Sequence, residues 1–176
     1  MRREEFEHAI RAAGAILGVD ELLIIGSQAL HGSVPGAVAE AVTQSVEVDI
    51  AVRGDADGRL ADLLDGSIGE GSLFHETFGY YAQGVVEATA MLPRGWHDRL
   101  VQFASPATND VVAWCLEPHD LWISKAIAGR PKDIAFCKAL VHTALIDSEL
   151  LRKRLDDVDG IPAQVRAAVA AMIPTR

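Results

Sequence analysis

The amino-acid sequence predicts an α+β protein, with a mixed β-sheet, flanking helices and a helical C-terminal third. Three observations support this class. Apolar residues recur at helical spacing near the N-terminus, and short segments in the middle are either apolar throughout or alternate between apolar and polar residues. From residue 117 onward, only helical spacing is found. We expect a core over residues 1–115 and a helical region over 116–176 that packs on it. At 176 residues, the two parts are predicted to form a single compact domain.

The first residues predict a helix, a strand and short helical pieces. Apolar residues recur at helical spacing within residues 3–17, namely Phe6, Ile10, Ala13 and Leu17. Residues 22–25 form an apolar run that stops at Gly26, which is typical of a buried strand that leads into a turn. Short helical pieces are then expected over 28–32 and 37–42.

Residues 45–52 alternate between apolar and polar side chains, which predicts a half-buried strand. One face carries Val46, Val48, Ile50 and Val52, and the other carries Ser45, Glu47, Asp49 and Ala51. A helix is expected next, near residues 57–65.

The rest of the chain predicts three further strands and then helices only. The strands are expected at 80–91, 100–104 and 111–115, where aromatic and β-branched residues are frequent. Pro118 lies where the first turn of a helix is expected, and Gly129 and Pro131 interrupt that helix. The helices that follow are predicted near 132–145, 147–157 and 162–172.

Composition narrows the range of functions. The net charge of −9 means that the overall field does not attract nucleic acid, so contact with RNA would need a local basic patch. Cys115 and Cys137 lie in apolar surroundings without metal-type spacing, which indicates buried thiols in a reducing compartment. No apolar run approaches the roughly 18 residues of a membrane span, and the amphipathic N-terminus is not a signal peptide. We therefore expect a cytoplasmic protein that does not contact the membrane.

Two carboxylates are the most informative polar residues. Glu47 and Asp49 are two positions apart on a predicted strand, so both project from one face, with backbones about 7 Å apart. Two neighbouring acids repel each other unless a cation or protons neutralise them. Mg²⁺ is commonly bound by one or two carboxylates together with substrate phosphates, so this pair is a candidate metal site.

A glycine–serine pair lies at the end of the preceding strand. Gly26 lets the backbone approach a phosphate closely, and the hydroxyl of Ser27 with neighbouring N–H groups can bind it. A phosphate site next to a metal site is what phosphoryl or nucleotidyl transfer requires.

Two segments resemble a known superfamily. Ile25-Gly26-Ser27, followed by Glu47-Val48-Asp49-Ile50, is similar to the motif of DNA polymerase β-like nucleotidyltransferases, a glycine–serine turn followed by two alternating acids. The segment from Leu116 to Asp133, with Asp120-Leu121, Lys125 and Arg130-Pro131-Lys132-Asp133, resembles one branch of that superfamily. That branch contains the AbiEii-like and DUF6036-type proteins, which are often found in toxin–antitoxin or phage-defence settings.

The resemblance implies a nucleotidyltransferase fold and a Mg²⁺-dependent transfer of a nucleoside monophosphate from an NTP to RNA, such as a tRNA, or to a protein. A toxin–antitoxin partner is also implied. By this resemblance Gly26 and Ser27 hold the triphosphate, and Glu47, Asp49 and a third acid bind the metal. Glu87 is the candidate for the third acid, and the cations expected near the phosphates or the acceptor are Lys125, Arg130 and Lys132.

Structural roles remain open for the same residues. Gly26 and Ser27 are compatible with a simple helix cap, the acid pair with a solvated strand face, and residues 130–133 with a link between two helices. Two further functions therefore stay open beside the enzyme. One is a catalytically inactive nucleotide-binding or protein-interaction module of the same fold, and the other is a structural protein whose acidic surface meets a basic partner.

Overall fold

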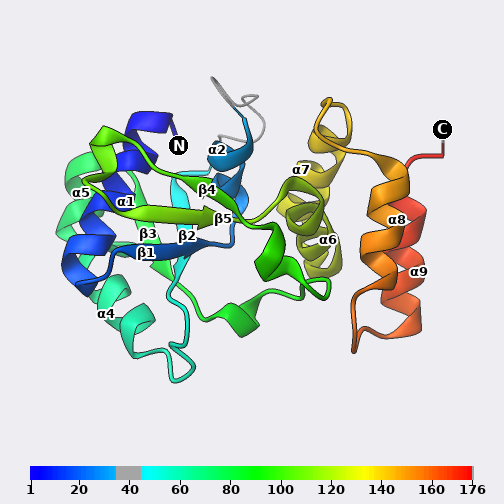
Figure 1. Cartoon of the computed structure of the whole chain (residues 1–176), viewed down its shortest axis with the longest axis horizontal. Helices are drawn as coiled ribbons and strands as arrows, with labels where there is room; N and C mark the ends of the chain where they lie inside the picture. Colours follow the sequence, from blue (N-terminus) through cyan, green and yellow to red (C-terminus); the bar gives the residue numbers. More distant parts are fainter. Residues whose placement is uncertain (35–44, 176) are drawn as a thin grey trace. The chain divides into compact units, whose positions relative to one another are not determined.

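The computed structural model describes residues 1–34 and 45–175 and divides the chain into two compact units (Figure 1). The first unit comprises residues 1–89 and 100–116, and the second comprises 90–99 and 117–176. Residues 90–99, which the predicted division assigned to the core, therefore group with the C-terminal helices. The helical piece predicted over 37–42 lies outside the described residues.

The first unit contains a five-stranded sheet with the order β3-β2-β1-β5-β4. Its strands are β1 (Glu21–Ile24), β2 (Glu47–Ala51), β3 (Tyr81–Gly84), β4 (Val101–Phe103) and β5 (Val112–Cys115). β1 pairs antiparallel with β2 and parallel with β5, β2 pairs parallel with β3, and β4 pairs antiparallel with β5. The sheet is therefore mixed, and the α+β prediction is confirmed.

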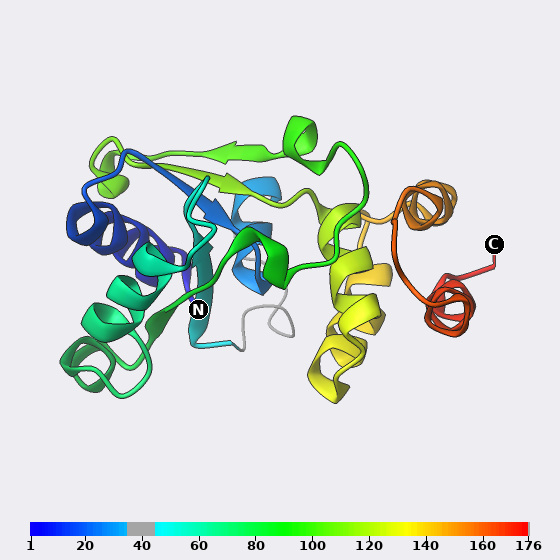
Figure 2. The ribbon, with the colours of Figure 1, turned by 90° about the horizontal axis from the view of Figure 1, so that it is seen from below.

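Helices cover one face of this sheet. The elements are α1 (Arg3–Leu17), α2 (Leu30–Ser33), α4 (Arg59–Ile68) and α5 (Leu73–Phe78), with short 3₁₀ turns η1 (Ser27–Ala29), η2 (Glu87–Thr89) and η4 (Pro106–Thr108). α1 and α4 pack against each other and against the strands (Figure 2). The rings of Phe6 on α1 and Phe103 on β4 lie 5.1 Å apart, and a Cβ added at Gly84 would lie 2.1 Å from the carbonyl oxygen of Ala61 on α4.

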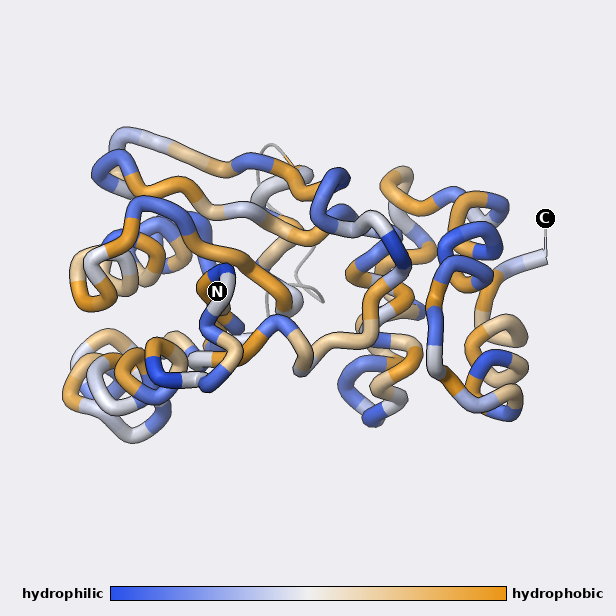
Figure 3. Tube along the Cα trace, turned by 60° about the horizontal axis from the view of Figure 1, so that its bottom comes forward, coloured by the Kyte–Doolittle hydropathy of each residue, from blue (hydrophilic) through white to orange (hydrophobic). Residues whose placement is uncertain are grey.

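The burial pattern of β2 fixes the orientation of its acids. Val48 and Ile50 are 0% and 1% exposed, whereas Glu47 and Asp49 on the opposite face are half-buried. The predicted alternation is therefore confirmed for residues 47–50. It is wrong for Val46, which is 47% exposed because β2 begins only at Glu47. The apolar stretches that anchor the strands are orange in Figure 3.

Two local predictions differ from the structure. The strand predicted over 80–91 ends at Gly84, because the chain then turns into η2. Helix α5 was not predicted, since its surroundings are rich in glycine. The Ser72 hydroxyl caps it by accepting a hydrogen bond from His75 N at 3.2 Å, and Gly79 ends it with a left-handed φ of 77°.

The second unit is a small helical bundle. Its elements are η3 (Trp96–Arg99), α6 (Pro118–Ala128), α7 (Pro131–Val141), α8 (Ser148–Asp156) and α9 (Ala163–Met172). α6 packs against the other three helices, and Trp122 on α6 is fully buried, with its Nε1 donating to the carbonyl of Cys137 on α7 at 3.1 Å. Burial of such a ring contributes at least about 2 kcal/mol to stability. Within the described residues, no helix combines the length and apolarity needed to cross a membrane.

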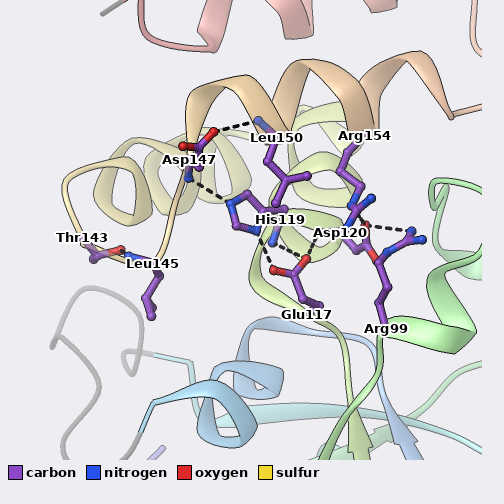
Figure 4. Close-up of polar contacts among 9 residues, drawn as sticks. All are labelled: Arg99, Glu117, His119, Asp120, Thr143, Leu145, Asp147, Leu150 and Arg154. Atoms are coloured by element: carbon purple, nitrogen blue, oxygen red, sulfur yellow. Dashed lines mark hydrogen bonds and ion pairs between the residues drawn. The ribbon is translucent and has the colours of Figure 1, made fainter.

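A buried ion network joins residues 90–99 to this bundle (Figure 4). Asp120 on α6 is 0% exposed, and its carboxylate accepts hydrogen bonds from Arg99 Nε at 2.8 Å and Nη2 at 3.1 Å. Arg154 on α8 places its Nε 3.2 Å from the same carboxylate. A charge removed from water needs such partners, so the network ties η3 and α8 to α6.

A second polar chain begins at the N-terminus of α6. The Glu117 carboxylate caps the helix and accepts from His119 Nδ1 at 2.5 Å, while His119 Nε2 accepts from Asp147 N at 2.9 Å. Nε2 of His119 therefore acts as an acceptor, and Nδ1 is the ring nitrogen that donates to Glu117. Burial alone would raise the pKa of Glu117, but its contacts with His119 hold that pKa below the ordinary value.

We expect Asp120→Asn to lower the free energy of unfolding by about 3 kcal/mol, because two arginines then lose their buried counter-charge. The matched control is Arg94→Gln, which removes an ion pair to Asp157 whose arginine side chain is 65% exposed. That control should cost less than about 1 kcal/mol. Urea unfolding followed by circular dichroism measures both, and equal losses would contradict the assignment of Asp120 as the buried anchor.

Candidate functional site

The pairing of β1 with β2 brings the glycine–serine turn to the acid pair. Ile24 lies opposite Ile50, and Ile25 N donates to the carbonyl of Asp49 at 3.2 Å. β1 therefore ends next to Asp49, and Gly26 is the first residue beyond this hydrogen bond.

Gly26 is in direct contact with the carboxylate of Asp49. A Cβ built at Gly26 would lie 1.6 Å from Asp49 Oδ2 and 2.6 Å from its Cγ. The backbone of Gly26 is extended, with φ −87° and ψ −170°, so any residue could adopt its conformation. A side chain at this position would therefore displace the Asp49 carboxylate, and backbone freedom is not the reason for glycine here. From the sequence we expected Gly26 to let the backbone approach a phosphate. In the structure, the space left by its missing side chain is occupied by the Asp49 carboxylate.

Ser27 begins the short turn η1, and the carbonyl of Gly26 accepts from Ala29 N at 3.0 Å. η1 runs into α2, which has only four residues, so the helix dipole contributes little at this point. The groups at the turn that can bind a phosphate are the half-buried Ser27 side chain and nearby backbone N–H groups.

Glu47 is held by a tyrosine on the next strand. Tyr81 lies opposite Glu47 in the parallel β2–β3 ladder, and its hydroxyl donates to Glu47 Oε2 at 3.0 Å. Burial and this hydrogen bond raise the pKa of Tyr81 to about 12, so the phenol is neutral at physiological pH. The site predicted from the sequence did not include Tyr81. The only feature of the sequence that pointed to it is its place near the start of the strand predicted over 80–91.

The structure does not bring Glu87 to the acid pair. Glu87 lies in η2, beyond the end of β3, and its Oε1 accepts from the backbone N of Gly54 at 3.3 Å. Gly54 follows β2 at the end opposite Glu47, and Gly54 and Glu87 line a pocket of about 270 Å³. The β3 residues that lie beside Glu47 and Asp49 are Tyr81 and Gln83. Among residues 1–34 and 45–175, no group of three or more His, Cys, Asp or Glu side chains could hold a metal ion.

The residues present nevertheless fit a magnesium ion that is shared with a substrate. Glu47 and Asp49 supply hard oxygen ligands from one strand face, and the glycine–serine turn lies against Asp49. Mg²⁺ keeps several waters and often takes only one or two carboxylates, with phosphate oxygens completing its shell. Two carboxylates beside a turn that carries a hydroxyl and backbone N–H groups are compatible with that pattern.

The profile of one family, described as a nucleotidyltransferase of unknown function (DUF6036), matches residues 5–170. The chain belongs to the DUF6036 family. The superfamily resemblance drawn from the glycine–serine turn and the acid pair is thereby confirmed. No curated protein and no solved structure gives a significant match.

In this DUF6036 protein two of the three cations in the segment from Leu116 to Asp133 contact an aspartate. Asp133 on α7 is 2% exposed, and its carboxylate lies 3.5 Å from Lys125 Nζ and 2.6 Å from Arg130 Nε. Lys125 is on α6, so this cluster links α6 to α7. Such a link between two helices is the structural role that the sequence left open for residues 130–133. Lys132 is exposed in the first turn of α7.

A further pocket, of about 350 Å³, lies where β1 begins and β2 ends, at the opposite end of these strands from the glycine–serine turn. Its lining includes Leu23, Arg53 and Trp114. Trp114 pairs in register with Leu23, and Leu23 with Ala51, so the indole lies on the sheet face that carries Asp49. The one signal for Trp114 in the sequence is a large aromatic residue within the short strand predicted at 111–115.

We expect Gly26→Ala to destabilise the first unit by about 1–3 kcal/mol, because the new Cβ needs the space of the Asp49 carboxylate. In an Asp49→Ala background the same substitution should cost much less, since the clashing oxygen is gone. A double-mutant cycle of urea unfolding measures this coupling, and additive costs would contradict the close contact.

Proposed function

We propose that this protein is a cytoplasmic Mg²⁺-dependent nucleotidyltransferase that transfers a nucleoside monophosphate from an NTP to an acceptor hydroxyl. The observation that carries the proposal is the contact between Asp49 and Gly26, which sets a carboxylate pair against the glycine–serine turn. Membership of a nucleotidyltransferase family supports the reaction class.

Each group has a role in this proposal. Glu47 and Asp49 would hold the cation, and Ser27 with the N–H groups of its turn would orient the triphosphate. When bound, Mg²⁺ neutralises phosphate charge and polarises the reacting phosphoryl group. The acceptor oxygen forms a bond to the α-phosphorus, the bond to pyrophosphate breaks, and the acceptor proton leaves to water.

The acceptor that we propose is an RNA, such as a tRNA, or a protein, in a toxin–antitoxin or phage-defence setting. This part rests on the family resemblance. The net charge of −9 opposes RNA as a whole, so an RNA acceptor would need local cations such as Lys132 and the 56% exposed Arg130. Lys125 and Arg130 would then act while remaining close to Asp133.

The test uses each of the four NTPs labelled at the α-phosphate, with Mg²⁺ and either bulk tRNA or a protein extract as acceptor. Asp49→Asn and Glu47→Gln should each lower label transfer by about 100-fold or more, since loss of a ligand should exceed the effect of losing its supporting groups. Glu21→Gln is the matched control, because Glu21 is an exposed strand carboxylate on β1. Retained transfer in the Glu47→Gln/Asp49→Asn double variant would refute the proposal.

A second candidate function is a nucleotide-binding module without turnover. It is favoured by the register of β3, which sets Tyr81 and Gln83 beside the acid pair where a third acid was predicted. Calorimetry with Mg²⁺ and each NTP separates the two functions, since binding without label transfer supports the module. Glu87→Gln tests the remaining sequence prediction, because a loss equal to that of Asp49→Asn would make Glu87 a ligand.

A further inference from the structure

Tyr81 is built into the acid pair from the neighbouring strand. Parallel register places it beside Glu47 on the same face of the sheet, and its hydroxyl lies 3.0 Å from Glu47 Oε2. The residue is 8% exposed, and its ring lies 4.7 Å from that of His75 on α5. A ring confined in this way holds its hydroxyl in one place, so the hydrogen bond restrains the orientation of the Glu47 carboxylate.

The adjacent tyrosine offers a contrast within the same strand region. The chain contains two tyrosines, Tyr80 and Tyr81. The hydroxyl of Tyr80 lies 2.6 Å from Nδ1 of His8 on α1, and its ring contacts Phe74 and Phe78. Both tyrosines are mostly buried, with exposed fractions of 7% and 8%. Tyr80 therefore matches Tyr81 in burial and in having a bonded hydroxyl, but not in contact with the acid pair.

The chemistry of the hydroxyl suits a group that supports a metal ligand. A neutral phenol donates one hydrogen bond and adds no negative charge to a site that already has two carboxylates. Metal ligands in proteins commonly have such outer partners, which fix their orientation, and loss of a partner lowers metal affinity about 10–100-fold. The bond to Oε2 leaves the other oxygen of Glu47 outside this contact.

We propose that Tyr81 is a positioning residue of the cation site: its hydroxyl orients Glu47 as a ligand for a divalent cation. The inference rests on the proposed function, in which Glu47 and Asp49 hold the metal. Tyr81 acts through Glu47 and is not itself a ligand.

The test measures Mn²⁺ binding by the whole chain with electron paramagnetic resonance, which reports the free ion and needs no substrate. Tyr81→Phe should weaken Mn²⁺ affinity by about 10-fold or more, while the matched control Tyr80→Phe should stay within about twofold of the wild type. Thermal unfolding of both variants shows whether they remain folded at the temperature of the titration.

A double variant separates positioning from general destabilisation. If Tyr81 acts through Glu47, adding Tyr81→Phe to Glu47→Gln should cause no further loss of Mn²⁺ affinity, whereas an equal loss in both backgrounds would overturn the inference. Wild-type affinity in Tyr81→Phe would also overturn it, and would leave the proposed metal site intact. Absence of Mn²⁺ binding by the wild type would instead overturn the metal site itself, and the role of Tyr81 with it.

Discussion

The carboxylate of Asp49 occupies the space that a side chain at Gly26 would fill, and the organisation of the candidate site follows from this contact. The antiparallel pairing of β1 with β2 brings the two residues together, because β1 ends opposite Ile50 and the next residue, Ile25, bonds to Asp49. On the other face, the buried Val48 and Ile50 anchor the strand in the core. The buried apolar face thus fixes the position of the polar face, and the missing side chain at Gly26 lets the glycine–serine turn approach the acids.

The electrostatics of this site differ from those of a three-carboxylate centre. A third anion beside Glu47 and Asp49 would increase their mutual repulsion, and a cation would have to offset it. Tyr81 provides a neutral donor in that place, and its raised pKa keeps the hydroxyl protonated. The pair can then be neutralised by one divalent ion, with the remaining coordination positions left to phosphate and water.

Much of this was accessible from the sequence. The period of two in residues 45–52 gave the faces of β2, because alternation depends only on local backbone geometry. The same holds for the amphipathic α1 and for the breaks at Gly129 and Pro131. The glycine–serine turn and the acid pair were correctly placed on neighbouring elements, and with the second signature segment they indicated the superfamily that the family match confirms.

Which side chains from distant segments contact each other was decided only by the tertiary structure. Lys125 and Arg130 looked available for phosphate, yet both lie against the buried Asp133. Arg130 precedes Asp133 by three residues at the start of α7, whereas Lys125 becomes its neighbour only when α6 packs on α7. The sequence by itself determined which residues carry charge and which face of each element they occupy, since propensity and periodicity act over a few residues. The register that joins Tyr81 to Glu47, and the turn of the chain that carries Glu87 away from them, depend on contacts between segments more than 30 residues apart. No local pattern encodes such distances, because strand order and helix packing are set by the burial of the whole core.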